Sequence, residues 1–264
     1  MTASAGSQLV GFLADISFVG AVFGLLLYGC WMWLGRETLV GLGRLSLVIA
    51  FGAGVMRFAL GHTAGFPFLD LYLFVLIGLF LLLEFLFQMS VLGLLVSAVA
   101  SVLASLRYWP LPPMHRVLAP NAAIAYWWVL RDLAVTTGAA VMTLGIGSAL
   151  LLYLHRDRRP STQVHPNDLR DVASLLAKGA VPLFAFGAFC AGAALSLAPG
   201  VLAIWGFACL VVLTLVALAW LAFAGQRRYS GGRVLLLTVL NVLAIVAYAS
   251  SGVLAGLTPG GRIP

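Results

Sequence analysis

Charged side chains are scarce in this chain of 264 residues: they make up 9% of it, whereas hydrophobic residues make up 62%. Because a soluble domain carries about 25% charged residues, the composition excludes an ordinary soluble fold. The mean hydropathy of +1.09 indicates a polytopic membrane protein whose first partner is the lipid bilayer. The net charge of +7 does not indicate nucleic-acid binding, because the basic residues are spread over short loops.

Cysteine is equally rare, with three residues that stand singly in apolar stretches. No C-x-x-C motif occurs, which argues against a disulfide framework and against covalent haem attachment. The sequence also lacks a G-x-x-x-x-G-K-[ST] loop, a Ser/His/Asp arrangement and a histidine in the middle of an apolar stretch. We therefore expect no enzyme, no cofactor and no metal. Residues 1–17 have no basic n-region and lead into a full-length span, so we expect them to be retained.

Long apolar stretches are what the chain has in abundance, and each is long enough to cross a bilayer as a helix. They cover residues 11–34, 39–60, 67–84, 89–106, 132–154, 179–198, 201–224 and 233–256. We expect an all-α membrane bundle of about eight transmembrane helices, with residues 1–264 forming a single domain. Short interfacial helices should accompany it: an aromatic-rich one before Arg131, and an amphipathic one at Asn167–Lys178 with Asn167 as its N-cap.

The stretch from Asn121 to Arg159 indicates the orientation of the chain. It begins with aromatic residues, continues without charge from Leu133 to Leu154, and ends in a basic cluster, which is typical of the cytoplasmic side. This orientation places ten of the 15 basic residues in the cytoplasm, namely Arg36, Arg44, Arg156, Arg158, Arg159, Arg170, Lys178, Arg227, Arg228 and Arg233. The bias predicts a bacterial-type inner-membrane protein with both termini on the periplasmic side.

Four ionisable residues lie inside or near the predicted spans: Asp15, Arg57, Asp70 and Glu84. Such a group is costly in lipid, so it marks either a function or an ion pair. Asp15, Arg57 and Asp70 fall near the outer ends of the first three spans, which predicts a structural ion pair between Arg57 and one or both aspartates. A ligand-binding role is the alternative. Glu84 falls at the turn after the third span, where we expect an exposed carboxylate.

The histidines lie in predicted loops, and only two of them share the outer side, His62 and His115. Imidazole is a common axial ligand of haem iron and a common metal ligand, so these two are the candidates for such a site. The simpler interpretation is that both are solvated loop residues.

Several stretches in a fixed order resemble the integral-membrane cytochrome c assembly family, the CcsA-type haem-handling proteins and their HemX-like relatives. Arg57 followed by GFPFLDLYL resembles the family's Arg, G-x-P and Asn-x-Tyr-Glu segment, although Leu73 stands in the place of the glutamate. YWWVLRDLAV resembles the aromatic-led span that opens with Trp-x-x-x-His-Val, with Trp127 in place. Residues 167–178 leading into the sixth span, and the last two spans around QRRYSGGR, continue the resemblance.

The chain departs from the family at each expected haem ligand. Arg131 stands in the place of one histidine, Arg228 roughly in that of a second, and Thr258 in that of a third. Only SLAPGVLAIWG occupies the place of the family's tryptophan-rich haem loop. Because Arg and Thr do not serve as axial ligands of haem iron, the resemblance implies a relative that kept the bundle and lost the haem chemistry.

Three functions follow from these observations. The first is a non-catalytic CcsA-like subunit that serves structure or assembly in a larger electron-transfer or photosynthetic membrane complex, with other membrane subunits as partners. The second is a haem-handling or haem-sensing protein of cytochrome c biogenesis with relocated ligands: His62, His115, or a methionine such as Met56 or Met114. The third is a small-molecule carrier with Arg57 and Asp70 at the mouth of a cavity, although no span is broken near the midplane.

Overall fold

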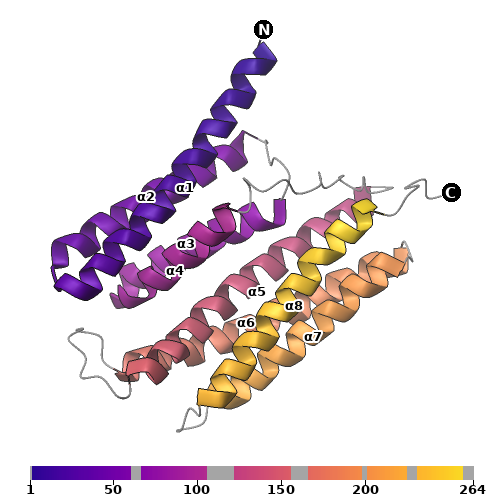
Figure 1. The fold of residues 1–264 in the computed structure, drawn as a ribbon. Helices are drawn as coiled ribbons and strands as arrows, with labels where there is room; N and C mark the ends of the chain where they lie inside the picture. Colours follow the sequence, from indigo (N-terminus) through magenta and orange to yellow (C-terminus); the bar gives the residue numbers. More distant parts are fainter. Residues whose placement is uncertain are drawn as a thin grey trace. The chain divides into compact units, whose positions relative to one another are not determined.

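The structure is a computed structural model that describes residues 2–60, 67–105, 122–155, 166–197, 201–224 and 231–257. The described residues form helices joined by short turns, without a strand among them (Figure 1). The helices are α1 (Thr2–Leu34), α2 (Glu37–Ala59), α3 (Pro67–Phe87), α4 (Val91–Ser105), α5 (Ala122–His155), α6 (Pro166–Leu197), α7 (Val201–Ala224) and α8 (Gly231–Leu257). The prediction of an all-α fold is confirmed, and each predicted span corresponds to one helix.

Six of these helices, α1, α2, α3, α5, α6 and α7, are long and apolar enough to cross a membrane. The other two contain shorter apolar stretches, Val91–Ser105 in α4 and Leu235–Tyr248 in α8. Helices suit the hydrocarbon core because their backbone N–H and C=O groups bond within the segment. In the most apolar window of α1, α2 and α3 only 33% of the residues are buried, so most of their apolar surface is free to meet lipid. The chain is a polytopic membrane protein.

The two segments predicted as interfacial helices are continuous with spanning helices. Residues 122–130 are the first turns of α5, and Asn167–Lys178 lies within α6. Val172 and Leu176 on the apolar face of this segment are buried. A Cβ atom built at Gly145 of α5 would lie 3.2 Å from Cβ of Leu176, so this face packs on α5. The amphipathic pattern at the start of α6 therefore reflects helix packing rather than a separate helix on the membrane surface.

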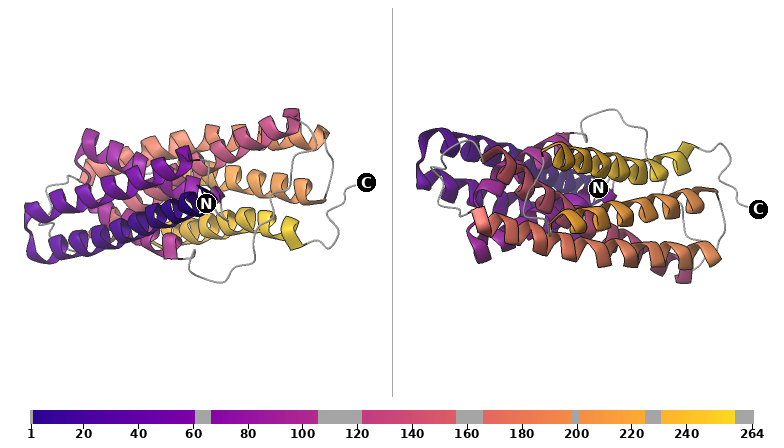
Figure 2. Two further views of the ribbon diagram at one scale, coloured as in Figure 1. Left: turned by 90° about the horizontal axis from the view of Figure 1, so that it is seen from above. Right: turned by 90° about the horizontal axis from the view of Figure 1, so that it is seen from below.

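The described helices fall into two compact units. The first unit consists of α1–α4 and residues 166–169 at the start of α6. The second consists of α5, α7, α8 and α6 from Arg170 onward. In the first unit, α1 packs on α2 and α4, and α3 packs on the same two helices; in the second, α8 packs on α5 and α7. Within each unit the helices run lengthwise beside one another, as Figure 1 and Figure 2 show. The interpretation of residues 1–264 as one domain stays a prediction.

The first unit is organised around the ring of Tyr28, which is fully buried. A Cβ atom built at Gly93 of α4 would overlap Cζ of Tyr28, and one at Gly43 of α2 would lie 2.9 Å from its Cε2. Phe80 of α3 meets the same ring edge-on, with the two centroids 6.2 Å apart. The four helices therefore meet in one layer, the Tyr28 layer (Tyr28, Gly43, Phe80 and Gly93), where two glycines leave space for the ring.

Because the Tyr28 ring occupies the space beside Gly93, we expect Gly93→Ala to lower the free energy of unfolding by about 1–3 kcal/mol, the usual cost of overpacking a core. Thermal unfolding of the purified protein in lipid nanodiscs measures the change. Gly41→Ala is the matched control, since a Cβ atom at Gly41 of α2 would meet nothing within 4 Å. Equal melting temperatures for Gly93→Ala and the wild type would contradict the packing around Tyr28.

In the second unit, α5 contacts the three other helices. Gly138 of α5 faces Phe184 of α6, whose Cε1 would lie 3.0 Å from an added Cβ atom. Gly145 of α5 lies beside Trp220 of α7, and Arg131 of α5 lies over the ring of Tyr248 of α8. In agreement with these contacts, 72% of the residues in the apolar window of α5 are buried. Arg131 of α5 is thus held largely against protein, with 23% of its side chain exposed, whereas the side chain of Asp132 is 42% exposed.

Candidate functional site

The structure describes three arginine–carboxylate pairs: Arg44 with Glu84, Arg57 with Asp70, and Arg131 with Asp132. The first two join α2 to α3 in the first unit, and the third lies on α5 in the second unit. Paired charges are the usual form in which ionisable residues are tolerated inside a membrane. These pairs are therefore candidates for a functional site in the described part of the chain.

Arg57 and Asp70 form a two-pronged ion pair between the end of α2 and the start of α3. Nη1 of Arg57 donates a hydrogen bond of 3.0 Å to Oδ1 of Asp70, and Nη2 lies 2.8 Å from Oδ2. The arginine side chain is 9% exposed and that of the aspartate 27%. A fork of this kind orients both side chains as well as neutralising them.

Asp15, the third member predicted for this cluster, lies on α1 and is exposed. Two bonds set the register of α1 and α2: Ser17 Oγ donates to the carbonyl oxygen of Ala50, and Ser46 Oγ donates to that of Gly20. This register places Asp15 beside the second half of α2. The structure thus brings Arg57 and Asp70 together, with Asp15 on the neighbouring helix.

Glu84 is buried, with 4% exposure, so the expectation of an exposed carboxylate is wrong. Its Oε1 atom accepts hydrogen bonds from Arg44 Nε at 2.7 Å and from Ser90 Oγ at 2.6 Å, and it forms an ion pair with Arg44 Nη2. Arg44 Nη2 also donates to Ser90 Oγ at 3.2 Å. One signal in the sequence points to this pair: in antiparallel helices, the spacing from Arg44 to Arg57 nearly equals that from Asp70 to Glu84.

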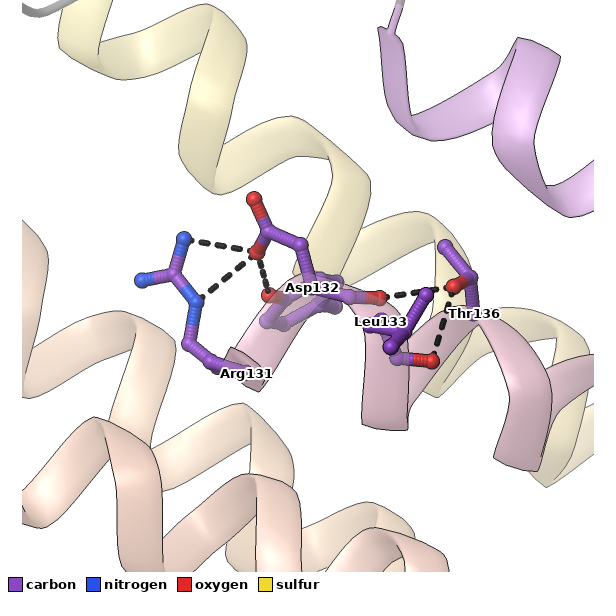
Figure 3. Close-up of polar contacts among 5 residues, drawn as sticks. Arg131, Asp132, Leu133 and Thr136 are labelled. Carbon is purple, nitrogen blue, oxygen red and sulfur yellow. Dashed lines mark hydrogen bonds and ion pairs between the residues drawn. The ribbon is translucent and has the colours of Figure 1, made fainter. Parts of the chain in front are cut away.

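Arg131, the residue in the place of a haem ligand, belongs to a third cluster that joins α5 to α8 (Figure 3). Asp132 Oδ1 accepts a hydrogen bond of 2.9 Å from Arg131 Nε and lies 2.8 Å from Nη2. The same oxygen accepts a 2.9 Å hydrogen bond from the hydroxyl of Tyr248. The guanidinium carbon of Arg131 lies 5.9 Å from the centroid of the Tyr248 ring, which adds a cation–π contact. We call these three residues the Arg131 cluster.

About one turn further along α5, the hydroxyl of Thr136 bonds to its own helix. It lies 2.7 Å from the carbonyl oxygen of Asp132 and 3.0 Å from that of Leu133, and it is directed at both in Figure 3. The hydroxyl is therefore occupied within α5 and offers no free donor to a ligand. Because the cation of Arg131, the carboxylate of Asp132 and the hydroxyl of Tyr248 bind one another, the cluster suits helix association better than catalysis.

The remaining predicted site residues, His62, His115, Arg228 and Thr258, lie outside the described residues, so their roles stay predictions. Within the part of the chain that the structure describes, no group of three His, Cys, Asp or Glu residues is placed to hold a metal ion. The thiols of Cys190 and Cys209 are free and buried, and that of Cys30 is free and exposed.

Comparison of the chain with protein-family models, with curated proteins and with solved structures finds no match in any of the three. The resemblance to the cytochrome c assembly family therefore rests on the residues named above and stays a prediction. The geometry adds a chemical observation: two of the three described arginine–carboxylate pairs join α2 to α3, and the third, on α5, is joined to α8 by the hydroxyl of Tyr248.

Proposed function

We propose that this chain is a non-enzymatic helical subunit that serves structure or assembly in a larger membrane complex, of the electron-transfer or photosynthetic kind. It is a divergent relative of the cytochrome c assembly family, and it lies in a bacterial-type inner membrane with both termini on the periplasmic side. The observation on which the proposal rests is the Arg131 cluster. Where the family has a haem-ligating histidine, this chain has an arginine bound to Asp132 and stacked on Tyr248.

The chemistry of this cluster supports a role without haem. A guanidinium keeps its proton at any physiological pH, so Arg131 offers no lone pair to iron. The phenol of Tyr248 is an axial ligand in some haem proteins, but here it is buried and donates to Asp132. An intramolecular bond of this kind stabilises the contact between α5 and α8, which is what a structural subunit needs.

The lipid-facing surface supports a role within a complex. Phe12, Phe23 and Leu26 of α1 are each more than half exposed, as is Phe189 of α6. In lipid, neighbouring proteins associate through shape and small-residue contacts rather than through a hydrophobic drive. Since short connections join most of the described helices, the helix faces are the largest surface on which another membrane subunit can dock.

Mild purification tests this proposal. We expect a tagged chain, extracted from its native membrane into lipid nanodiscs, to bring other membrane polypeptides with it in fixed ratio. We also expect the chain, once separated from those partners and loaded with haem, to show no Soret band. Recovery of the chain alone would argue against a subunit.

A stoichiometric Soret band on the separated chain would replace the proposal with the haem-handling alternative. Loss of that band in His62→Ala or His115→Ala, but not in the control His165→Ala, would locate the iron ligands. The spectrum therefore separates the two functions independently of the polypeptides that co-purify.

A further inference from the structure

Several buried polar atoms in the first unit have no hydrogen-bond partner among the described residues, and two of them belong to side chains at the Tyr28 layer. One is Oε2 of Glu84, whose other oxygen receives the donors of Arg44 and Ser90. The other is the hydroxyl of Tyr28, a residue with 0% exposure. A buried polar atom left without a partner costs free energy, so such atoms in native proteins are usually satisfied by something.

The contacts of the layer place the side chains of Tyr28 and Glu84 at the same level of the unit. Arg44, which binds Glu84, directly follows Gly43, against which the Tyr28 ring packs. Ser90, which also binds Glu84, lies one helical turn before Gly93, the second glycine under the ring. Glu84 and Arg44 are also the charged groups that act electrostatically on the Tyr28 hydroxyl. The two side chains are therefore connected to the same layer through residues next to Gly43 and Gly93, although no direct hydrogen bond joins them.

We propose that Glu84 Oε2 and the Tyr28 hydroxyl together form a binding site for a water molecule at the Tyr28 layer. Such a ligand must donate to a carboxylate oxygen and also bond to a phenol, and buried water typically makes about two to four bonds of this kind. A metal cation fits less well, because Arg44 already supplies the positive charge that balances Glu84. The Arg44 side chain is 45% exposed, so it links the site to the surface of the unit.

The proposed water site does not depend on the proposed function. The direction in which Tyr28→Phe shifts the melting temperature tests it. If a water joins the two side chains, Tyr28→Phe removes a bonded hydroxyl and should lower the melting temperature by about 2–4 °C. If the hydroxyl is simply buried and unsatisfied, its removal should raise the melting temperature instead. A rise or no change would overturn the proposal.

A mutant cycle ties this effect to Glu84. In a Glu84→Gln background the atom at the Oε2 position no longer accepts as a carboxylate does, so we expect Tyr28→Phe to have a different effect there than in the wild type. Asp70→Asn is the matched control, because it changes the carboxylate at the opposite end of α3. Equal effects of Tyr28→Phe in the wild type and in Glu84→Gln would overturn the proposal.

Radiolytic footprinting gives a second, independent readout. X-rays split bound water in place, and the hydroxyl radicals label the side chains next to it even where bulk solvent does not reach. We expect Tyr28 to be labelled despite its burial, whereas Phe184, an equally buried ring, should stay unlabelled. Absence of label on Tyr28 in a sample whose exposed aromatic residues are labelled would show that the site holds no water.

Discussion

Arg44→Leu should lower the free energy of unfolding by about 3–5 kcal/mol, because it leaves Glu84 buried without its cation. The carboxylate side chain is 3% exposed, so water reaches it poorly once Arg44 is gone. Thermal unfolding and the yield of folded protein in nanodiscs measure the loss. Arg36→Leu is the matched control for removal of a positive charge near the same turn, since Arg36 is exposed and makes no side-chain capping bond.

Removing Arg44 and removing Glu84 should lower the stability of the protein by different amounts. Glu84→Leu leaves Arg44, whose side chain is 45% exposed and reaches water, so we expect a smaller loss than for Arg44→Leu. The double change Arg44→Leu with Glu84→Leu removes both charges, and replacing a whole buried pair by apolar residues is often neutral or stabilising. We therefore expect it to recover most of the stability. A double variant as unstable as Arg44→Leu alone would show that the loss of stability does not come from the stranded charge of Glu84.

Arg57→Leu should also destabilise the protein, toward the lower end of the range of about 3–5 kcal/mol, because it strands Asp70. Asp70 is less deeply buried than Glu84, with 27% of its side chain exposed, so part of its charge can be hydrated. Melting temperature and complex yield are again the measurements. An unchanged melting temperature and yield would mean that Arg57 reaches water and that the pair contributes nothing.

Arg57→Lys separates charge from geometry at this site. It keeps the positive charge but replaces a planar fork with a single ammonium, so the two parallel contacts to Asp70 are lost. We expect a melting temperature between those of the wild type and Arg57→Leu. Full retention of stability would show that the charge alone is sufficient.

Hydropathy predicted the helices well because the bilayer sets their length. Residues 201–224 were expected as a span and form α7 with the same bounds, and the third span was expected to start at Pro67, where α3 begins. The starts of α5 and α6 were predicted less accurately. At Asn167–Lys178, capping and amphipathicity fit a separate surface helix as well as the start of a long one, and only the packing of Leu176 against α5 decides between them.

The site was predicted less completely, because pairing between distant helices is a tertiary property. The Arg57–Asp70 contact follows from charges at facing span ends, which hydropathy locates. The partner of Glu84 lies 40 residues away in the chain, and burial at the turn after α3 depends on how α2 and α4 close over it. Arg131 was considered only as a substituted ligand, whereas its structural partners, Asp132 and Tyr248, required the contact between α5 and α8.

The packing of Tyr28 also determines how α1 is rotated about its own axis. Large apolar side chains surround this helix, and Phe12, Phe23 and Leu26 point outward although each is as hydrophobic as the residues inside. Lipid therefore does not discriminate between one face of α1 and another. A turn of the helix by one residue, about 100°, would carry the Tyr28 ring away from the notch between Gly43 and Gly93. The fit of the Tyr28 ring, together with the Ser17–Ala50 hydrogen bond, selects the rotation of α1 about its axis, and the distribution of hydrophobicity does not.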